Sequence, residues 1–280
     1  MPNLGCALVC ALAWIISSTA LAAPIYPDTV FSFERGPQDI RDPASPRANV
    51  GSPEDALGPP DGAIVSLGER GQITVRFPVP LVDGPGTDLV VHENAFSFTD
   101  GGTGETFVFA ELAFVEISSD GVIFARFPTF SPIAGPIGEF GIYSTAEVDA
   151  SMGLAGLRVS DPSLPLDSGD PFDFSDLASA PVVGSGAVDL QAIRYVRIRD
   201  VIGDGSEFDR LGDPIFDPWP SSAGNLNAGF DLDAVVGVHS VPEPGTFALL
   251  VLAGLSACFA RLPGRRVRST RLGCPKTRAL

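Results

Sequence analysis

Short segments of alternating apolar and polar residues, separated by turn residues, recur between residues 24 and 240. Residues 73–77 and 230–238 alternate for most of their length, so each places one set of side chains on a core. The chain holds 31 Gly and 26 Pro in 280 residues, more turn formers than an average soluble domain carries. No long amphipathic pattern of helical period is present. The pattern therefore predicts an all-β protein.

Further strands are predicted from the same signals. They cover residues 29–34, 63–67, 87–92, 107–117, 122–127, 156–160 and 192–201. Residues 107–117 are apolar on both alternating sets, which predicts a central strand covered on both faces, and residues 119–121 then turn the chain into 122–127. This number of short strands predicts an antiparallel β-sandwich or jelly roll over residues 23–240.

The charge and the cysteine content of residues 24–240, called the body below, exclude several classes of partner and site. Residues 24–240 carry 33 acidic and 11 basic residues, a net charge of −22, which repels the phosphates of nucleic acids and anionic lipids and favours cations. The same residues contain no Cys and only two His, His92 and His239. Disulfides, cysteine zinc sites and thiolate nucleophiles are therefore excluded from the body, and no nucleic-acid partner is expected.

The first 22 residues predict a secretory signal peptide. Residues 4–23 form an uncharged apolar run that ends in the small-x-small pattern of Ala20, Leu21 and Ala22. An uncleaved anchor helix is the alternative interpretation. We therefore expect the body to be exported through the inner membrane.

The other end of the chain has three parts in a fixed order. Val241, Pro242, Glu243 and Pro244 precede an apolar run over residues 247–260, and an Arg cluster at residues 261–266 follows. Two prolines keep the motif out of a helix and accessible to an enzyme. This order resembles the PEP-CTERM sorting signal of Gram-negative bacteria that produce exopolysaccharide. The resemblance implies that residues 241–266 are recognised by an exosortase-type processing enzyme, with residues 267–280 as a basic tail.

The apolar run 247–260 is short for a lasting anchor. As a helix it would cover about 21 Å, whereas the hydrocarbon core of a bilayer is about 30 Å thick. We therefore expect only transient residence in the inner membrane, although an ordinary single-span anchor is the alternative. The sorting resemblance implies a final location in the cell envelope, at the outer surface or in the extracellular matrix.

Parts of the body resemble discoidin-like, that is galactose-binding-like, sandwich domains. The resemblance rests on residues 56–62, the hairpin 115–121, residues 194–198 and a last strand that holds Asp233. Residues 71–94 look like uncharacterised bacterial cell-surface proteins that often carry PEP-CTERM tails. In the discoidin-like family an Asp-Gly loop and an acid of the final strand share a calcium ion, and Asp61 and Asp233 occupy the matching places.

A second group of candidate calcium ligands follows the strand 192–201. Calcium takes six to eight hard oxygen ligands, which a flexible acidic loop punctuated by Gly and Pro supplies. A solvated acidic loop is the competing interpretation. The acids of this loop are Asp200, Asp204, Glu207, Asp209, Asp213 and Asp217.

For carbohydrate binding, the aromatic supply of the body is small. Trp219, beside the acidic loop, is the strongest candidate, with Tyr195 and Arg197 as weaker ones. Packing under a loop explains Trp219 as well, and ion pairing explains Arg197.

No pattern in the chain predicts a catalytic residue. There is no nucleophile elbow, P-loop or dinucleotide fingerprint, and no organic cofactor is expected. The sequence therefore favours a non-enzymatic, secreted β-sandwich for adhesion or exopolysaccharide association, with a calcium-stabilised loop. Two alternatives remain: a carbohydrate-active hydrolase that uses a carboxylate pair, and a structural surface protein without a ligand.

Overall fold

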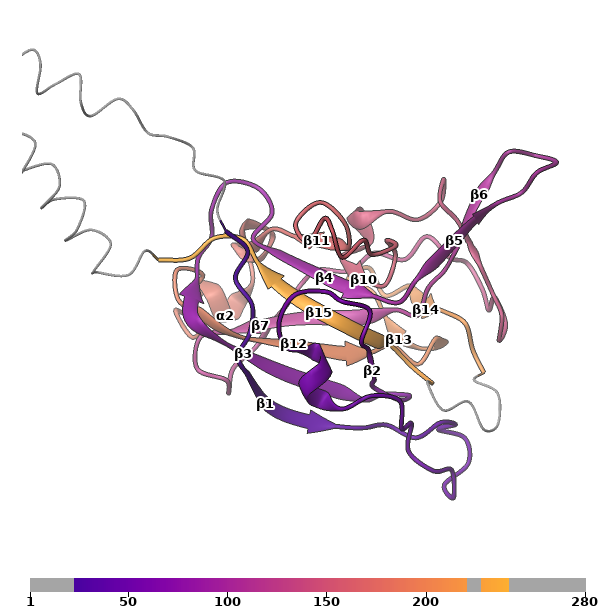
Figure 1. Cartoon of the computed structure of the whole chain (residues 1–280), viewed down its shortest axis with the longest axis horizontal. Coiled ribbons are helices and arrows are strands. Elements are labelled where there is room, and N and C mark those ends of the chain that lie inside the picture. The colour runs from indigo at the N-terminus through magenta and orange to yellow at the C-terminus, as the bar shows by residue number, and fades with distance from the viewer. Residues whose placement is uncertain (1–22, 221–227, 242–280) are drawn as a thin grey trace, which may run out of the picture. The chain divides into compact units, whose positions relative to one another are not determined.

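The structure is a computed structural model that describes residues 23–220 and 228–241 (Figure 1). Of the two units into which the chain divides, Met1–Val241 and Pro242–Leu280, only the first contains described residues. The predicted signal peptide, the motif residues Pro242 to Pro244, the apolar run 247–260, the Arg cluster and the tail 267–280 lie outside them. Within the described ranges, no helix has the length and apolar character needed to cross a membrane.

Within residues 23–220 and 228–241, strands make up most of the regular structure, joined by three short 3-10 helices and one short α-helix. In chain order the elements are β1 (Thr29–Glu34), η1 (Pro53–Ala56), β2 (Val65–Ser66), β3 (Gln72–Leu81), β4 (Leu89–Glu93), β5 (Phe96–Thr99), β6 (Thr106–Phe109), β7 (Ala113–Ser118), β8 (Ala125–Arg126), β9 (Tyr143–Ser144), η2 (Ala150–Met152), β10 (Leu154–Ala155), β11 (Asp170–Phe172), η3 (Phe174–Leu177), α2 (Pro181–Gly184), β12 (Ile193–Asp200), β13 (Asp204–Phe208), β14 (Pro214–Phe216) and β15 (Asp231–Gly237).

Two antiparallel sheets form the body. The larger has the order β1-β3-β12-β7-β10, with β8 added on β7, and the smaller has the order β11-β4-β15-β2. Strands distant in sequence lie side by side, as where β12 pairs with both β3 and β7. The predicted all-β, antiparallel class is confirmed, and the arrangement is sandwich-like.

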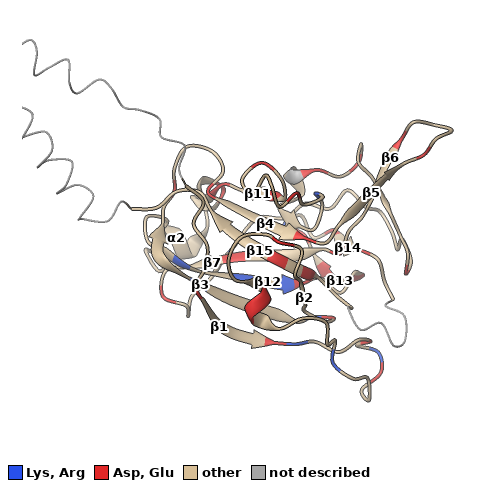
Figure 2. Cartoon of the chain, in the orientation of Figure 1, with Lys and Arg blue, Asp and Glu red and all other residues tan. Residues whose placement is uncertain are grey.

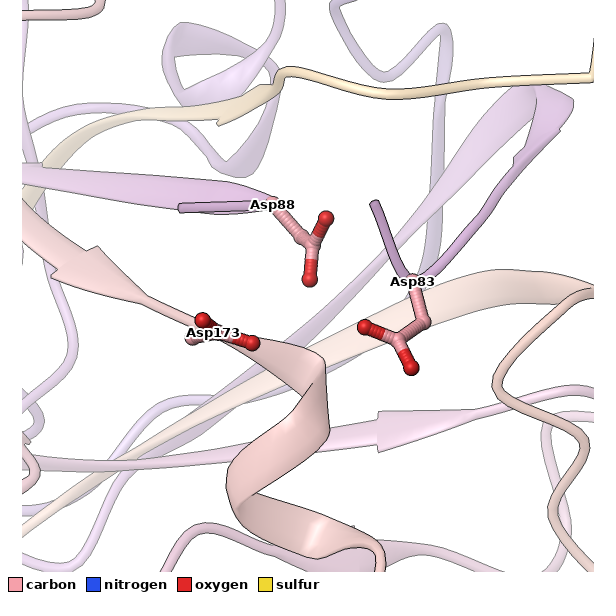
Figure 3. Close-up of side chains that lie close together, drawn as sticks. All are labelled: Asp83, Asp88 and Asp173. Atoms are coloured by element: carbon pink, nitrogen blue, oxygen red, sulfur yellow. The ribbon is translucent and has the colours of Figure 1, made fainter. Parts of the chain in front are cut away.

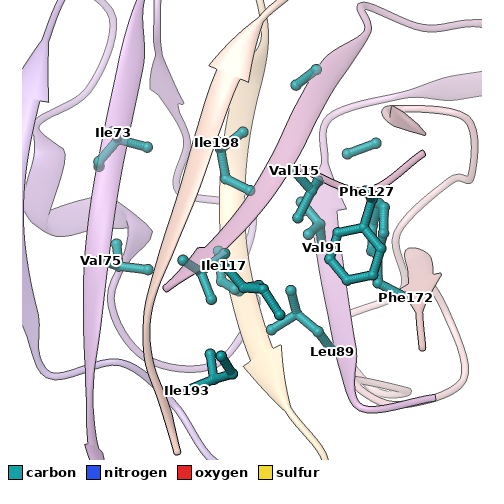
Figure 4. Close-up of a cluster of buried hydrophobic side chains, with 14 of the residues drawn as sticks. Ile73, Val75, Leu89, Val91, Val115, Ile117, Phe127, Phe172, Ile193 and Ile198 are labelled. Atoms are coloured by element: carbon teal, nitrogen blue, oxygen red, sulfur yellow. The ribbon is translucent and has the colours of Figure 1, made fainter. Parts of the chain in front are cut away.

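The apolar core lies between these two sheets (Figure 4). Ile73 and Val75 of β3 face Ile198 and Val196 of β12 in register, and all four are buried in one cluster. Leu89 and Val91 of β4 reach the same cluster from the smaller sheet. Alternation along each strand delivers these side chains to one face, which explains why the period-2 segments in the sequence located the strands.

The prediction of one central strand over residues 107–117 is wrong. The segment is divided into β6 and β7, which belong to different sheets. Ala110, Glu111 and Leu112 lie between the two strands and carry no Gly or Pro that would mark the break. The predicted strand 156–160 is also misplaced, because β10 comprises only Leu154 and Ala155.

The last strand is more buried than its alternating sequence predicts. Every residue of β15 is buried, including Asp231 and Asp233. Leu232 and Val235 join the main core, while Ala234 and Val236 pack with Val90 on the other face of the smaller sheet. A register shift between Leu232 and Ala234 allows this change of face.

Two small sheets lie beside the sandwich. Strands β5, β6 and β9 form one, in which the β5–β6 hairpin projects from the body (Figure 1), and β13 pairs with β14 in the other. The hairpin between β7 and β8 is confirmed. The side chain of Asp120 in its loop accepts hydrogen bonds from the backbone amides of Val122 and Ile123.

Candidate metal centre

Several strands carry apolar side chains on the face that packs into the core, and an acidic residue continues this set near one end of the strand. On β12, Val196 and Ile198 point into the core and Asp200 continues their alternation. Asp200 lies opposite the core residue Ala113 of β7. Asp200 is 1% exposed, so an acidic residue occupies an inward-facing position at which the alternation predicts an apolar residue.

The smaller sheet repeats this arrangement. On β4, Glu93 follows Leu89 and Val91 in the inward-facing set, and it lies opposite the core residue Leu232. On β11, Asp170 lies opposite Val91. Both carboxylates are therefore directed to the inner side of the sheet, and both residues are buried.

Loops add further acids at this end of the core. Glu69, Glu111, Asp200 and Asp217 line a cavity of about 10 Å³, together with uncharged residues. Figure 2 shows acidic segments where β13, β14 and the nearby end of β15 meet. We call the whole group the carboxylate layer: Glu69, Glu93, Glu111, Asp170, Asp200, Asp217 and Asp231.

Backbone amides hold the cavity carboxylates in place. Asp200 accepts hydrogen bonds from the amides of Phe230 (2.8 Å) and Arg70 (2.6 Å), and Asp217 accepts one from Leu112 (3.0 Å). Among the described residues, neither Asp200 nor Asp217 forms an ion pair with an Arg, Lys or His side chain. Backbone hydrogen bonds therefore fix the positions of these two carboxylates, but no cationic side chain among the described residues neutralises them.

Burial changes the protonation of these groups. It raises the pKa of Asp217 and of Asp200 well above the ordinary value for an aspartate, and mutual repulsion adds to the rise for Asp217. Burial likewise raises the pKa of Glu111, which is further raised by repulsion from Asp231 and Glu93. The backbone hydrogen bonds favour the ionised forms of Asp200 and Asp217 but do not cancel the effect of burial.

Glycines let the chain approach the cavity closely. Gly203 has a φ of +82°, and a Cβ at this position would collide with the Oδ1 atom of Asp217. Gly229 has a φ of +68°, and a Cβ there would lie 2.8 Å from the Oδ1 atom of Asp200. Any side chain at either position would enter the space between backbone and carboxylate.

The chemistry of this group fits a hard cation. Carboxylate oxygens are the preferred ligands of Ca²⁺, and four acids from separate segments line the cavity, although no three of them have oxygens within 4.8 Å of one another. A divalent ion would also relieve the repulsion that raises the pKa values of these acids. We therefore regard the cavity carboxylates as the candidate metal centre.

A second, more compact acidic group lies elsewhere in the sandwich. One carboxylate oxygen from each of Asp83, Asp88 and Asp173 lies within 4.8 Å of the others (Figure 3). Asp88 is already satisfied: its Oδ1 atom accepts from the Gly84 amide and lies 2.7 Å from Nδ1 of His239, and its Oδ2 atom accepts from the Phe174 amide. Through these contacts Asp88 connects the loop before β4, the start of η3 and the chain after β15.

The acidic loop predicted to bind calcium is only partly assembled. Asp200 and Asp217 meet at the cavity, whereas Asp204, Asp209 and Asp213 do not line it. Asp209 accepts hydrogen bonds from the amides of Ser131 and Asp213, and Asp204 accepts from Ser206. The carboxylates of Asp204 and Asp209 thus organise the β13–β14 region, to which Asp213 contributes its backbone. Glu207, from the same loop, forms an ion pair with Arg199 at 2.8 Å.

Asp61 and Asp233 lie next to each other. The Asp233 carboxylate accepts hydrogen bonds from the backbone amides of Asp61 (3.2 Å) and Gly62 (3.3 Å). The Asp61 side chain accepts from the Ala63 amide. The pairing of loop and last strand is thus present, and a shared calcium ion there remains a prediction.

The three candidate carbohydrate contacts lie in two places. Tyr195 and Arg197 are on the outer face of β12, where Tyr195 contacts the Phe31 ring and Arg197 pairs with Glu116 at 2.5 Å and covers the Phe124 ring. Trp219 contacts Arg41 instead.

An exposed aromatic surface that the sequence did not suggest lies on the β5–β6 hairpin. Phe96 stacks on Phe109 with ring centroids 5.2 Å apart, and Phe98 stacks on Phe107 at 5.6 Å. The four positions share one face of the hairpin, and Phe96 and Phe98 are 56% and 44% exposed. We call these four residues the Phe ladder.

Glu69, Glu93, Glu111, Asp170 and Asp231 were not among the predicted ligands. For Glu93 a signal existed, because it occupies an apolar position of an alternating strand. Comparison with models of protein families gave no match, and comparison with curated proteins gave none either.

Proposed function

We propose that this protein is a non-enzymatic, calcium-stabilised β-sandwich that is exported and retained in the cell envelope or extracellular matrix, where it associates with exopolysaccharide. The carboxylate layer is the observation that carries the proposal. Burying an ionised carboxylate costs several kcal/mol unless a cation or hydrogen bonds compensate. Protons or a metal ion therefore belong in this layer, and outside the cell calcium is the natural hard cation.

The size of the cavity supports a role for an ion rather than for catalysis. About 10 Å³ is room for one water-sized particle, far less than a sugar ring occupies. Carboxylates that enclose such a space cannot flank a glycosidic bond, as a hydrolase would require. Of the two alternatives from the sequence, the hydrolase thus receives no support from these acids.

The Phe ladder supports association with a surface. Solvent-exposed aromatic rings that are stacked in register offer flat apolar contact area, the kind of surface on which sugar rings pack. Asp100 and Glu105, at the tip of the same hairpin, and the net charge of −22 over residues 24–240 oppose an anionic partner. We therefore propose a neutral polysaccharide as the matrix component.

The end of the body supports the sorting proposal. After β15 the chain pairs Ser240 with Leu81, and the amide of Val241 donates to the carbonyl of Pro80 at 3.3 Å. Val241 is exposed, so the first residue of the proposed motif is accessible directly after the last strand. The exosortase-type enzyme is the proposed partner at this point.

Cosedimentation tests the function directly. The full chain, in mild detergent, is mixed with an insoluble neutral glucan in calcium or in a chelator. We expect calcium-dependent retention on the glucan without release of soluble sugar. Retention that is equal in calcium and chelator would contradict a calcium-dependent association, and release of reducing sugar would restore the hydrolase alternative.

A further inference from the structure

Glu93 and Asp170, two buried acids of the carboxylate layer, each have one carboxylate oxygen without a hydrogen-bond partner among the described residues. These oxygens are Oε2 of Glu93 and Oδ1 of Asp170. Glu93 is 4% exposed and Asp170 is 1% exposed, so water does not reach them from bulk solvent. A buried acceptor without a donor is costly, and it is rare in folded proteins.

These two acids are separate from the cavity that Asp200 and Asp217 line. Neither Glu93 nor Asp170 lines that cavity, and both come from the smaller sheet. Asp170 lies opposite Val91, and Glu93 continues the same inward-facing set of β4, so the two side chains leave adjacent strands on one face. Asp231 lies beside them on β15, where the Ser66 hydroxyl donates to its Oδ1 atom.

The remaining contacts of the pair involve other atoms than the two unpartnered oxygens. Asp170 uses its other oxygen to accept from the amides of Gly156 (2.7 Å) and Leu157 (3.0 Å). The exposed Arg158 attracts the Asp170 carboxylate but forms no ion pair with it. Repulsion from Asp231 and Asp170 adds to the effect of burial on Glu93.

We propose that the protein binds a second calcium ion between Glu93 and Asp170, in addition to the cavity ion proposed at Asp200 and Asp217. The inference rests on the proposed calcium function and extends it from one ion to two. The unpartnered oxygens of Glu93 and Asp170 become ligands, while their other contacts stay as they are.

The position of Glu93 gives this second ion a structural consequence. Glu93 is the last residue of β4, and Asn94 and Ala95 lead directly into β5. The amides of Asn94 and Ala95 lie close enough to favour the charged form of Glu93. An ion on Glu93 therefore fixes the base of the β5–β6 hairpin, which carries the Phe ladder.

Counting bound calcium tests the inference. Native mass spectrometry and calcium titration are applied to the full chain in mild detergent, as wild type, as Glu93→Gln with Asp170→Asn, and as Asp200→Asn with Asp217→Asn. Glu54→Gln, an exposed acid in η1, is the matched control. We expect two ions for wild type and the control, and one for each double variant. Hydrogen exchange at residues 94–99 should become faster in the Glu93 double variant only.

Each alternative result has a separate meaning. Two ions retained by the Glu93 double variant, or a single ion in wild type that is lost only with Asp200 and Asp217, would overturn the second site and leave the proposed function intact. No ion in wild type would overturn both. Because the Gln and Asn substitutions keep side-chain size and remove buried charge, we expect these variants to fold. An equal unfolding midpoint in chelator, or a higher one, verifies this.

Discussion

Glu93 and Glu111 flank the two strands of the β5–β6 hairpin: Glu93 ends β4 before β5 begins, and Glu111 follows β6 before β7 begins. Each belongs to the carboxylate layer, and repulsion from Glu93 contributes to the raised pKa of Glu111. The base of the projecting aromatic hairpin thus holds one buried acid, Glu93, and one partly buried acid, Glu111. Neutralising these acids with a cation would couple ion binding to the position of the Phe ladder.

The carboxylate layer predicts an unusual pH dependence in the absence of calcium. Burial raises the pKa of Asp170 to about 7. The pKa of Asp170 in the folded state exceeds its value of about 3.9 in the unfolded state. The contribution of Asp170 to the free energy of unfolding is therefore complete below about pH 3.9 and is lost as the pH rises to about 7. In chelator, we expect wild type to lose up to about 4 kcal/mol relative to Asp170→Asn across this window.

Urea unfolding of both proteins at pH 5 and pH 8 measures the part of this difference that falls between pH 5 and about pH 7, about 2.7 kcal/mol. Burial lowers the pKa of His92, so His92 makes both proteins less stable as the pH falls. Because this effect is the same in wild type and Asp170→Asn, the comparison cancels it. In saturating calcium the trend should weaken or reverse, because a cation requires the ionised carboxylate. A wild-type protein in chelator that gains stability relative to Asp170→Asn as pH rises would contradict a protonated Asp170.

Close packing of Gly203 against Asp217 predicts a sensitive backbone position. Gly203→Ala should destabilise the protein by more than Gly212→Ala. Both have a positive φ, which costs roughly 1–2 kcal/mol for an L residue, but only at Gly203 would the Cβ collide with a carboxylate. Thermal unfolding in calcium compares the two variants. Equal midpoints would show that the Asp217 position is not constrained in this way.

If the Phe ladder is the binding surface, removing it should reduce retention on the glucan much more than it reduces the stability of the protein. Phe96→Ser with Phe98→Ser should reduce retention on the neutral glucan at least tenfold and shift the free energy of unfolding by about 1–3 kcal/mol, the value of two aromatic pairs. Phe140→Ser is the matched control, since Phe140 is 77% exposed and has no stacked partner among the described rings. Equal loss of retention in both proteins would remove the special role of the ladder.

Processing at the sorting motif is a separate prediction. Mass spectrometry of the protein recovered from the cell surface should show a C-terminus within or near residues 241–244, without the apolar run 247–260. The unprocessed form should accumulate when Pro242 and Pro244 are replaced by Ala, because the motif then no longer resists helix formation. Recovery of surface protein that ends at Leu280 would show that the tail is retained.

The sequence located most strands of the sandwich but missed its interruptions. The strands 29–34, 192–201 and 230–238 match β1, β12 and β15 because alternation or apolar content, followed by a clear turn, marks them. Residues 107–117 form two strands in different sheets, and Glu111 lies between them at the cavity. The apolar pattern on both sides of Glu111 gave no sign of this break.

The candidate site was predictable in part. Asp200 and Asp217 were expected ligands because they lie in an acidic loop, and both line the cavity. Glu93 could have been recognised as an acid at an inward position of β4. Glu69 lies in the loop between β2 and β3, and Asp170 lies in β11, so no local pattern connects these two distant parts of the chain. The Phe ladder was not predicted from the sequence, because Phe107 and Phe109 were assigned to a strand covered on both faces.

Thermal unfolding with and without calcium tests the central claim most directly. The protein is heated in chelator, in excess magnesium and in excess calcium at matched ionic strength, beside Asp200→Asn with Asp217→Asn. Each calcium site filled at 100 times its dissociation constant should stabilise wild type by about 2.7 kcal/mol, so the cavity site alone raises the midpoint by about 5 to 10 °C. The variant should have the higher midpoint in chelator and a smaller response to calcium. A wild-type midpoint that is the same in all three solutions would contradict a calcium-stabilised carboxylate layer.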